Sequence, residues 1–200
     1  MRSLIITGGT GGLGTDVVRR LSRDYRCIVL GHSQVDLTNE QSVARAFDEA
    51  GAIYGLVHLV GGFAAGSVRE TSLEIWTKML ALNTTAAFLA ARGALPHMSS
   101  PGRIVMISSI ATLLPSAGTA AYTVAKSALN ALVQALAAEE RANAITVNAI
   151  LPDAMATPAM LKETKDASKL VPLERVSETI AFLLSDAAAG TSGTLIPIRA

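Results

Sequence analysis

The stretch Thr7-Gly8-Gly9-Thr10-Gly11-Gly12-Leu13-Gly14 follows a short apolar run, Leu4–Thr7, and opens a stretch of helical character, Leu13–Arg23. Glycine permits a tight turn and lets a ligand approach the backbone closely. The amino terminus of a helix also favours a bound negative charge, such as that of a diphosphate. The alternative is a turn that only joins a strand to a helix. Its position in the chain favours a binding turn, with contacts from Gly8, Thr10, Gly12, Leu13 and Gly14.

Outward from this turn, the chain alternates short apolar runs with longer helical stretches. The runs predict six buried strands, at Leu4–Thr7, Cys27–Leu30, Leu56–Val60, Ile104–Ile107, Ile145–Leu151 and Leu195–Ile198. The longer stretches predict helices at Leu13–Arg23, Glu40–Glu49, Leu73–Ala91, Ala121–Arg141 and Ser177–Leu184. This alternation predicts a single α/β domain over residues 1–200, a Rossmann-like, doubly wound parallel sheet in three layers, α/β/α.

Composition excludes several classes of protein. Half of the 200 residues are apolar and 16% are charged, which excludes a disordered chain. The formal net charge is +1 with no long basic run, so neither nucleic acid nor an anionic membrane surface is an expected partner. No apolar run reaches the length of about 18 residues that a membrane span needs. The apolar run Ser3–Ile6 leaves no room for a secretory signal, and the one cysteine, Cys27, fits the cytoplasm.

Tyr122 and Lys126 stand four residues apart in the predicted helix Ala121–Arg141, so they share one helix face. An ammonium group close to a phenol favours the phenolate and lowers the phenol pKa from its ordinary value of about 10. A tyrosine of this kind serves as a general acid or base near neutral pH. The spacing alone is weak, because tyrosine and lysine often lie four apart on exposed helix faces. Other segments must support the assignment.

The glycine stretch resembles the TGxxxGxG motif of the short-chain dehydrogenase/reductase family, and the resemblance extends over essentially the whole chain. Ser109, after the predicted strand Ile104–Ile107, and Asn83, in Leu82-Asn83-Thr84, match family positions together with Tyr122 and Lys126. The segment Val147–Pro152 with Thr157-Pro158 resembles the family's strand and loop over the nicotinamide. Each has a plainer interpretation: Ser109 as a helix cap, Asn83 as a core residue and Pro152 as a strand terminator. Their joint order and spacing favour the family assignment.

The resemblance implies an NAD(P)-dependent oxidoreductase that transfers hydride between nicotinamide and a carbonyl or alcohol. Ser109 and Tyr122 would hydrogen-bond the substrate oxygen, with Tyr122 as general acid or base. Lys126 would lower the Tyr122 pKa and hold the nicotinamide ribose, and Asn83 would continue a proton relay through a water molecule. The family also implies cofactor contacts from His32, Ser33, Asp36, Leu37, Gly61, Pro152 and Thr157.

The segment Gly31-His32-Ser33 after the second strand carries no carboxylate, the group that usually selects NAD by accepting hydrogen bonds from the ribose 2′-hydroxyl. We therefore expect NADP(H) to be favoured over NAD(H), with weak phosphate contacts from His32 and Ser33. Asp36 resembles the family aspartate that meets the adenine amino group. A capping turn before the Glu40 helix remains the alternative for Asp36.

Three segments depart from the family pattern. Between Leu30 and Glu40 there is no room for the helix that the family usually carries. The chain has His58–Phe63 where an NNAG-like segment is expected, and Pro152-Asp153 where a proline–glycine pair is expected. We expect Asp153 to be a solvated turn residue rather than a carboxylate near the substrate. The Val-Gly-Gly-Phe segment also resembles quinonoid dihydropteridine reductases, compact members of the same family, which makes pteridine reduction an alternative activity.

Other features bear on partners and substrate. The three histidines, His32, His58 and His97, are scattered and predict no metal site. Family members often associate through the helix that matches Ala121–Arg141, so a homodimer or homotetramer is expected. A flap over Leu161–Lys169 and a partly apolar pocket predict a modest carbonyl compound; the expected pocket residues are Phe63, Leu113, Leu114, Met155 and Met160. A non-catalytic regulator that senses nicotinamide redox state, or a catalytically idle subunit, remains the alternative to an enzyme.

Overall fold

A computed structural model describes all residues, 1–200, and shows one sheet of six parallel strands. The strands are β1 (Ser3–Thr7), β2 (Arg26–Leu30), β3 (Ile53–His58), β4 (Met98–Ile107), β5 (Ile145–Pro152) and β6 (Leu195–Ile198). Their order across the sheet is β2-β1-β3-β4-β5-β6, so β2 and β6 form the edges. The predicted α/β class and the number of strands are confirmed. Strand β3 begins and ends earlier than the predicted Leu56–Val60, and β4 begins earlier than the predicted Ile104.

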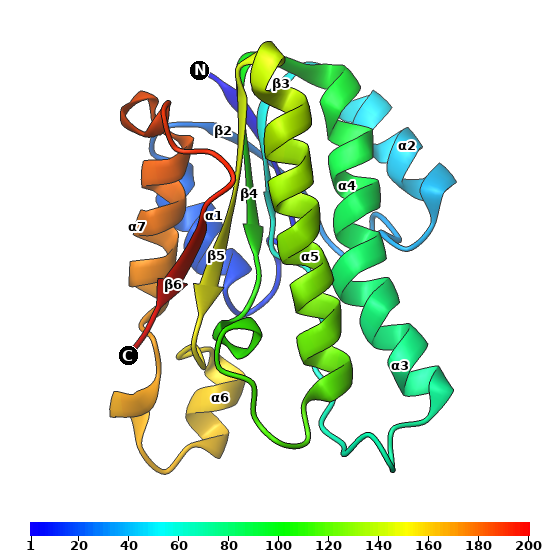
Figure 1. The fold of residues 1–200 in the computed structure, drawn as a ribbon. Helices are drawn as coiled ribbons and strands as arrows, with labels where there is room; N and C mark the ends of the chain where they lie inside the picture. The colour runs from blue at the N-terminus through cyan, green and yellow to red at the C-terminus, as the bar shows by residue number, and fades with distance from the viewer.

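Helices cover both faces of the sheet (Figure 1). They are α1 (Gly14–Leu21), α2 (Glu40–Ala50), α3 (Leu73–Leu80), α4 (Ala86–Ala94), α5 (Ala120–Glu139), α6 (Pro158–Glu163) and α7 (Leu173–Leu184). One apolar core lies between the sheet and α2, α4 and α5, and the second lies between the sheet and α1 and α7. Two covered faces explain why the strands are nearly continuous apolar runs. None of the helices combines the length and apolar character required to cross a membrane.

The predicted helix Leu73–Ala91 is divided in the structure. A π-helical turn, Ala81–Thr85, separates α3 from α4 and places the buried Asn83 at its centre. Single π-turns inside helices frequently occur at functional sites, because they redirect a side chain without ending the helix. Here the turn directs the Asn83 amide toward the end of β3.

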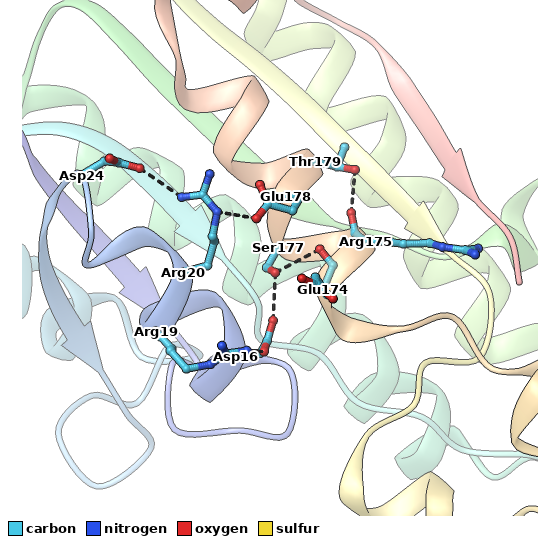
Figure 2. Close-up of polar contacts among 9 residues, drawn as sticks. All are labelled: Asp16, Arg19, Arg20, Asp24, Glu174, Arg175, Ser177, Glu178 and Thr179. Atoms are coloured by element: carbon cyan, nitrogen blue, oxygen red, sulfur yellow. Dashed lines mark hydrogen bonds and ion pairs between the residues drawn. The ribbon is translucent and has the colours of Figure 1, made fainter.

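Helices α1 and α7 pack side by side, and polar residues join their outer surfaces (Figure 2). The Arg20 guanidinium contacts the carboxylates of Asp24 and Glu178 at 3.0 and 2.6 Å. The Ser177 hydroxyl donates a 2.8 Å hydrogen bond to Asp16, which also pairs with Arg19. These contacts fix α1, and with it the glycine turn, against the C-terminal part of the chain.

Two irregular segments differ in how well they were predicted. The chain between Leu30 and Glu40 contains only turns and buries Val35 and Leu37 against the core, in agreement with the prediction that no helix fits there. The predicted flap Leu161–Lys169 is partly helical, since it includes the end of α6 and a 3₁₀ turn, Ala167–Lys169. Helix α7 begins before the predicted Ser177, because Pro172 precedes its first turn.

Candidate active site

The glycine turn lies at the carboxyl end of β1, where ligands bind in open α/β sheets. Gly8 has φ +73°, which a side chain would strain. A Cβ atom on Gly14 would come within 2.3 Å of the Gly8 carbonyl oxygen. The turn therefore closes on itself so tightly that both positions require glycine.

The turn also offers free hydrogen-bond donors. The N–H groups of Gly12 and Leu13, just before α1, donate to no other backbone group, and Gly12 is exposed. Thr10 is exposed beside Gly31, whose N–H donates to Gln34 Oε1 at 2.8 Å. Free N–H groups at a helix amino terminus fit the phosphates of a dinucleotide.

Lys126 on α5 is buried, and its Nζ donates a 2.8 Å hydrogen bond to the carbonyl oxygen of Ile107 at the end of β4. Burial lowers the pKa of this lysine to about 8, because the charged form loses hydration. Its ammonium group therefore lies close to its titration range at neutral pH.

Gly61, Asn83 and Lys126 converge beside the end of β3. A Cβ atom on Gly61 would come within 2.7 Å of Asn83 Oδ1 and 2.9 Å of Lys126 Nζ. The Asn83 amide donates to the carbonyls of Gly62 and Met79, both at 3.0 Å, and accepts a hydrogen bond from the Gly62 N–H at 3.1 Å. Asn83 is thereby held in one orientation next to the lysine.

Tyr122 and Ser109 are neighbours, but the expected effect of Lys126 on the tyrosine is not found. The pKa of Tyr122 is raised by burial, and the Ser109 hydroxyl, as a hydrogen-bonding neighbour, acts in the opposite direction. Lys126 is not among the causes of this shift, and its ammonium group donates to the carbonyl oxygen of Ile107. The net direction is thus opposite to the predicted lowering, because burial raises the pKa of Tyr122, and the role of Lys126 stays a prediction. Ser109 also accepts a 3.2 Å bond from the Ala111 N–H, so its capping interpretation is correct as well.

The expected pocket residues differ in exposure, and one of them, Phe63, contacts Tyr122. The Phe63 ring packs edge-on against the Tyr122 ring, with centroids 5.1 Å apart and an interplanar angle of 75°. Phe63 remains 64% exposed, and Leu113 and Leu114 are also exposed. Met155, in the loop after β5, and Met160, in α6, are partly buried. An exposed aromatic ring beside the tyrosine suits a ligand with an apolar face.

The sequence did not predict the buried position of His58, the last residue of β3, or its contact with Thr7. Its Nδ1 lies 2.9 Å from the Thr7 hydroxyl, and its Nε2 has no hydrogen-bond partner. Burial first, and then the charge of Lys126, lower the pKa of His58 to about 3. The available signal was that His58 opens the segment His58–Phe63, which stands where an NNAG-like segment is expected.

The predicted adenosine contacts are spread over exposed turns. His32 and Ser33 are exposed after β2, and Leu37 is buried in the core. Asp36 Oδ1 accepts hydrogen bonds from the N–H and hydroxyl of Thr38, at 2.9 and 2.7 Å, which lower the pKa of its carboxyl group. Asp36 thus stabilises a turn before α2, as its alternative interpretation predicts, but the residue that caps α2 is Asn39.

The segment after β5 faces the glycine turn. A Cβ atom on Gly12 would lie 3.1 Å from Thr157 Cβ, so the two segments nearly touch. The Thr157 hydroxyl caps α6 by accepting from the Met160 N–H, and Pro152 is buried at the end of β5. Asp153 accepts a local 2.9 Å bond from the Ala154 N–H, as in a turn. No group of three or more histidine, cysteine, aspartate or glutamate side chains has the arrangement of a metal site.

Comparison with known proteins agrees with this geometry. A family model described as Enoyl-(Acyl carrier protein) reductase matches residues 4–199. The 2,5-dichloro-2,5-cyclohexadiene-1,4-diol dehydrogenase LinX of Sphingobium indicum is 29% identical, over 97% of this chain and 93% of that protein. The inactive 2-(S)-hydroxypropyl-CoM dehydrogenase 2 of Xanthobacter autotrophicus is 32% identical, over 82% and 80% of the two chains. The structure titled "ElxO with NADP Bound" has a TM-score of 0.91 and 25% identity, covering 99% and 97% of the two chains.

The match extends over nearly the whole sequence, and it includes the glycine turn, the six-stranded sheet and the helix that carries Tyr122 and Lys126. Relatives with named activities are dehydrogenases. The chain therefore belongs to the short-chain dehydrogenase/reductase family, and it is an oxidoreductase.

Proposed function

We propose that this protein is an NAD(P)-dependent oxidoreductase that interconverts a small carbonyl compound and its alcohol. The observation that carries the proposal is the convergence of Asn83, Lys126 and Gly61 beside the Ser109–Tyr122 pair, at the same edge of the sheet as the glycine turn. The glycine turn, Gly61, Ser109 and Thr157 follow the carboxyl ends of β1, β3, β4 and β5, and Tyr122 and Lys126 lie on α5.

The glycine turn supports binding of a dinucleotide. Its free N–H groups at Gly12 and Leu13 and its glycine-rich backbone fit a diphosphate. Gly8, Thr10 and Gly14 belong to the same turn, Thr157 lies against Gly12, and Pro152 would contact the cofactor from the end of β5. When bound, the nicotinamide cofactor supplies or accepts the hydride.

The side chains of this chain handle the oxygen and the proton. Ser109 and Tyr122 hold the substrate oxygen, and Tyr122 gives up its proton during reduction or takes one during oxidation. Burial keeps the Tyr122 hydroxyl protonated in the free protein, which suits its role as the acid. Lys126 would hold the nicotinamide ribose when the cofactor is bound, and Asn83 would orient a water molecule beside it.

The preference for NADP(H) rests on two observations. The turn Gly31-His32-Ser33 has no carboxylate to repel a 2′-phosphate, and His32 and Ser33 are exposed there. The similar structure ElxO is described with NADP bound. Asp36, Leu37 and Gly61 would complete the contacts to adenine and nicotinamide.

The substrate proposed is a compact ring or short chain with an apolar face that lies on Phe63. The relative LinX acts, by its name, on a cyclic diol. Another relative is named as inactive, so a non-catalytic regulator is the competing function. The presence of Tyr122, Lys126, Ser109 and Asn83 together favours turnover.

Assembly and location are part of the proposal. Phe88 on α4 and Val124 on α5 are 45% and 44% exposed on the same side of the sheet, which supports a homodimer or homotetramer through these helices. The free, half-buried Cys27 fits the reducing cytoplasm.

A fluorescence titration with NADPH and NADH tests the proposal, followed by a carbonyl screen that includes quinonoid pterins. Saturable binding, tighter for NADPH, and turnover of a carbonyl compound are expected. Binding of neither nucleotide would refute the cofactor site, and binding without any turnover would favour the regulator.

A further inference from the structure

A cavity of about 650 Å³ lies at the opposite end of the sheet from the glycine turn. It is bordered by the starts of β4 and β5, the end of α5 and the loop before β6, at the top of the molecule in Figure 1. Arg103 and Thr146 in these strands are six residues before Ser109 and Pro152, so the cavity is about 20 Å from the catalytic end. It is therefore separate from the substrate site.

The cavity is lined by Arg103, whose charge is poorly compensated. The side chain is 2% exposed, yet its guanidinium donates only one hydrogen bond, from Nη1 to the Gly102 carbonyl at 2.8 Å. Its Nε has no partner, and the nearest carboxylate oxygen, on Asp186, is 4.0 Å from Nη2. A buried charge without close partners is costly, so an additional anion here would be stabilised.

Asp186 is also shared with a second arginine. Arg2 Nη1 contacts it at 2.9 Å, and this pair is on the protein surface. The guanidinium carbons of Arg2 and Arg103 are 4.4 and 5.8 Å from the centre of the Tyr54 ring, so the two cations lie near each other. The aromatic ring offsets part of the positive charge, but one carboxylate serves two guanidinium groups.

Further polar groups line the same cavity. Thr146 is only 7% exposed, and its buried hydroxyl has no hydrogen-bond partner. Gln134, near the end of α5, and Arg141, in the 3₁₀ turn after it, line the cavity and are exposed. Ser192 accepts a hydrogen bond from the Val147 N–H at 3.1 Å, which leaves its own hydroxyl hydrogen available to a ligand.

We propose that this cavity binds a small organic anion through a carboxylate or phosphate group. Arg103 and Arg141 supply positive charge, and Thr146, Ser192 and Gln134 supply neutral hydrogen bonds. Asp186 remains paired to Arg2 and sets the preference for a ligand of low charge. A bound anion would contact β4 at Arg103. The same strand ends at Ile107, whose carbonyl oxygen accepts the hydrogen bond from Lys126.

Amide chemical-shift titrations with inorganic phosphate and with succinate test this site. Saturable shifts at Gly190 and Gly193, which line the cavity, are expected, and the stronger probe identifies the preferred anionic group. Shifts at Gly11 and Gly12 separately report binding to the glycine turn. Arg141→Gln should weaken binding at the cavity by about tenfold, the loss expected for a charged hydrogen bond. Binding confined to the turn, or binding unchanged by Arg141→Gln, would overturn the proposal.

Thr146→Val provides a second measurement on the ligand-free protein. Because valine removes a buried hydroxyl that has no partner, this variant should melt at a higher temperature than the wild type while binding the anion more weakly. A lower melting temperature would mean that the hydroxyl is already satisfied, and the argument for a ligand at this position would fail. Ala138→Ser, at the rim of the same cavity, is the control and should change neither property strongly.

Discussion

The Nζ of Lys126 donates a hydrogen bond of 2.8 Å to the carbonyl oxygen of Ile107, and this bond ties α5 to the end of β4. The ammonium group is buried at a position where no carboxylate balances it, and its pKa falls to about 8 as a result. Lys126 is thus retained at the expense of folding stability, which is typical of a residue kept for function.

Replacement of Lys126 by methionine should stabilise the fold at neutral pH. The pKa is lower in the folded state, about 8, than its ordinary value of 10.5, so the unfolded chain binds the proton more readily. Protonation therefore favours unfolding, and the wild type should gain stability as pH rises from about 8 toward 10.5. The variant should lack this rise and be more stable at pH 7 by roughly 3 kcal/mol. Urea unfolding at several pH values measures the difference; parallel curves for the two proteins would contradict it.

Tyr122→Phe should remove catalysis and leave nucleotide binding intact. The phenol is the proposed proton donor, so kcat/KM should fall by about 10²–10⁴-fold. The ring is retained, and with it the edge contact to Phe63, so the fold should be unaffected. Steady-state kinetics and NADPH fluorescence provide the two measurements. Equal turnover by wild type and variant would exclude Tyr122 as the acid.

Gly61→Ala should damage the site more than the fold. The added methyl group would lie 2.7 Å from Asn83 Oδ1 and 2.9 Å from Lys126 Nζ, so one of the two must move. We expect kcat to fall at least tenfold, while thermal melting shifts by only a few degrees. Gly190→Ala is the matched control, because a Cβ atom there meets nothing within 4 Å. Similar activity in the two variants would argue against the assigned roles of Asn83 and Lys126.

His58→Asn should make the fold less sensitive to acid. The folded-state pKa of His58, about 3, is below its ordinary value of 6.5, so between these values only the unfolded chain takes up the proton. The wild type should therefore lose a few kcal/mol of stability as pH falls through this range. Asparagine can retain a bond to Thr7 without titrating, and the loss should be smaller. His97→Asn, where the histidine is partly exposed beside Asp48, is the control. Identical acid curves for wild type and His58→Asn would show that His58 is not the cause.

The strands and the glycine turn were predictable because they depend on local patterns. Apolar runs of strand length, and glycines that need positive φ or close approach, are visible in the sequence from Leu4 to Gly14. The π-turn around Asn83 was not predictable, because the apolar periodicity continues through Leu73–Ala91 without a break. Only the tertiary contact with Gly62 reveals why the helix widens there.

Electrostatics were the least predictable part of the site. The spacing of Tyr122 and Lys126 correctly places them on one helix, but it does not reveal that Ile107 binds the ammonium group. Arg103 was overlooked because an arginine before the apolar run Ile104–Ile107 suggests an exposed strand end. In the structure β4 begins at Met98, and its register with β5 places Arg103 opposite Thr146 in the interior.

The order of the strands leaves β2 and β6 as the open edges of the sheet. Parallel strands at an edge expose backbone groups that can recruit another chain and start fibre-like association. Strand β2 is only five residues long and begins with the exposed, charged Arg26. Strand β6 contains the exposed Pro197, which has no N–H to offer. Both edge strands thus discourage the addition of another strand, and a second copy of the protein would bind through side-chain contacts rather than by extending the sheet.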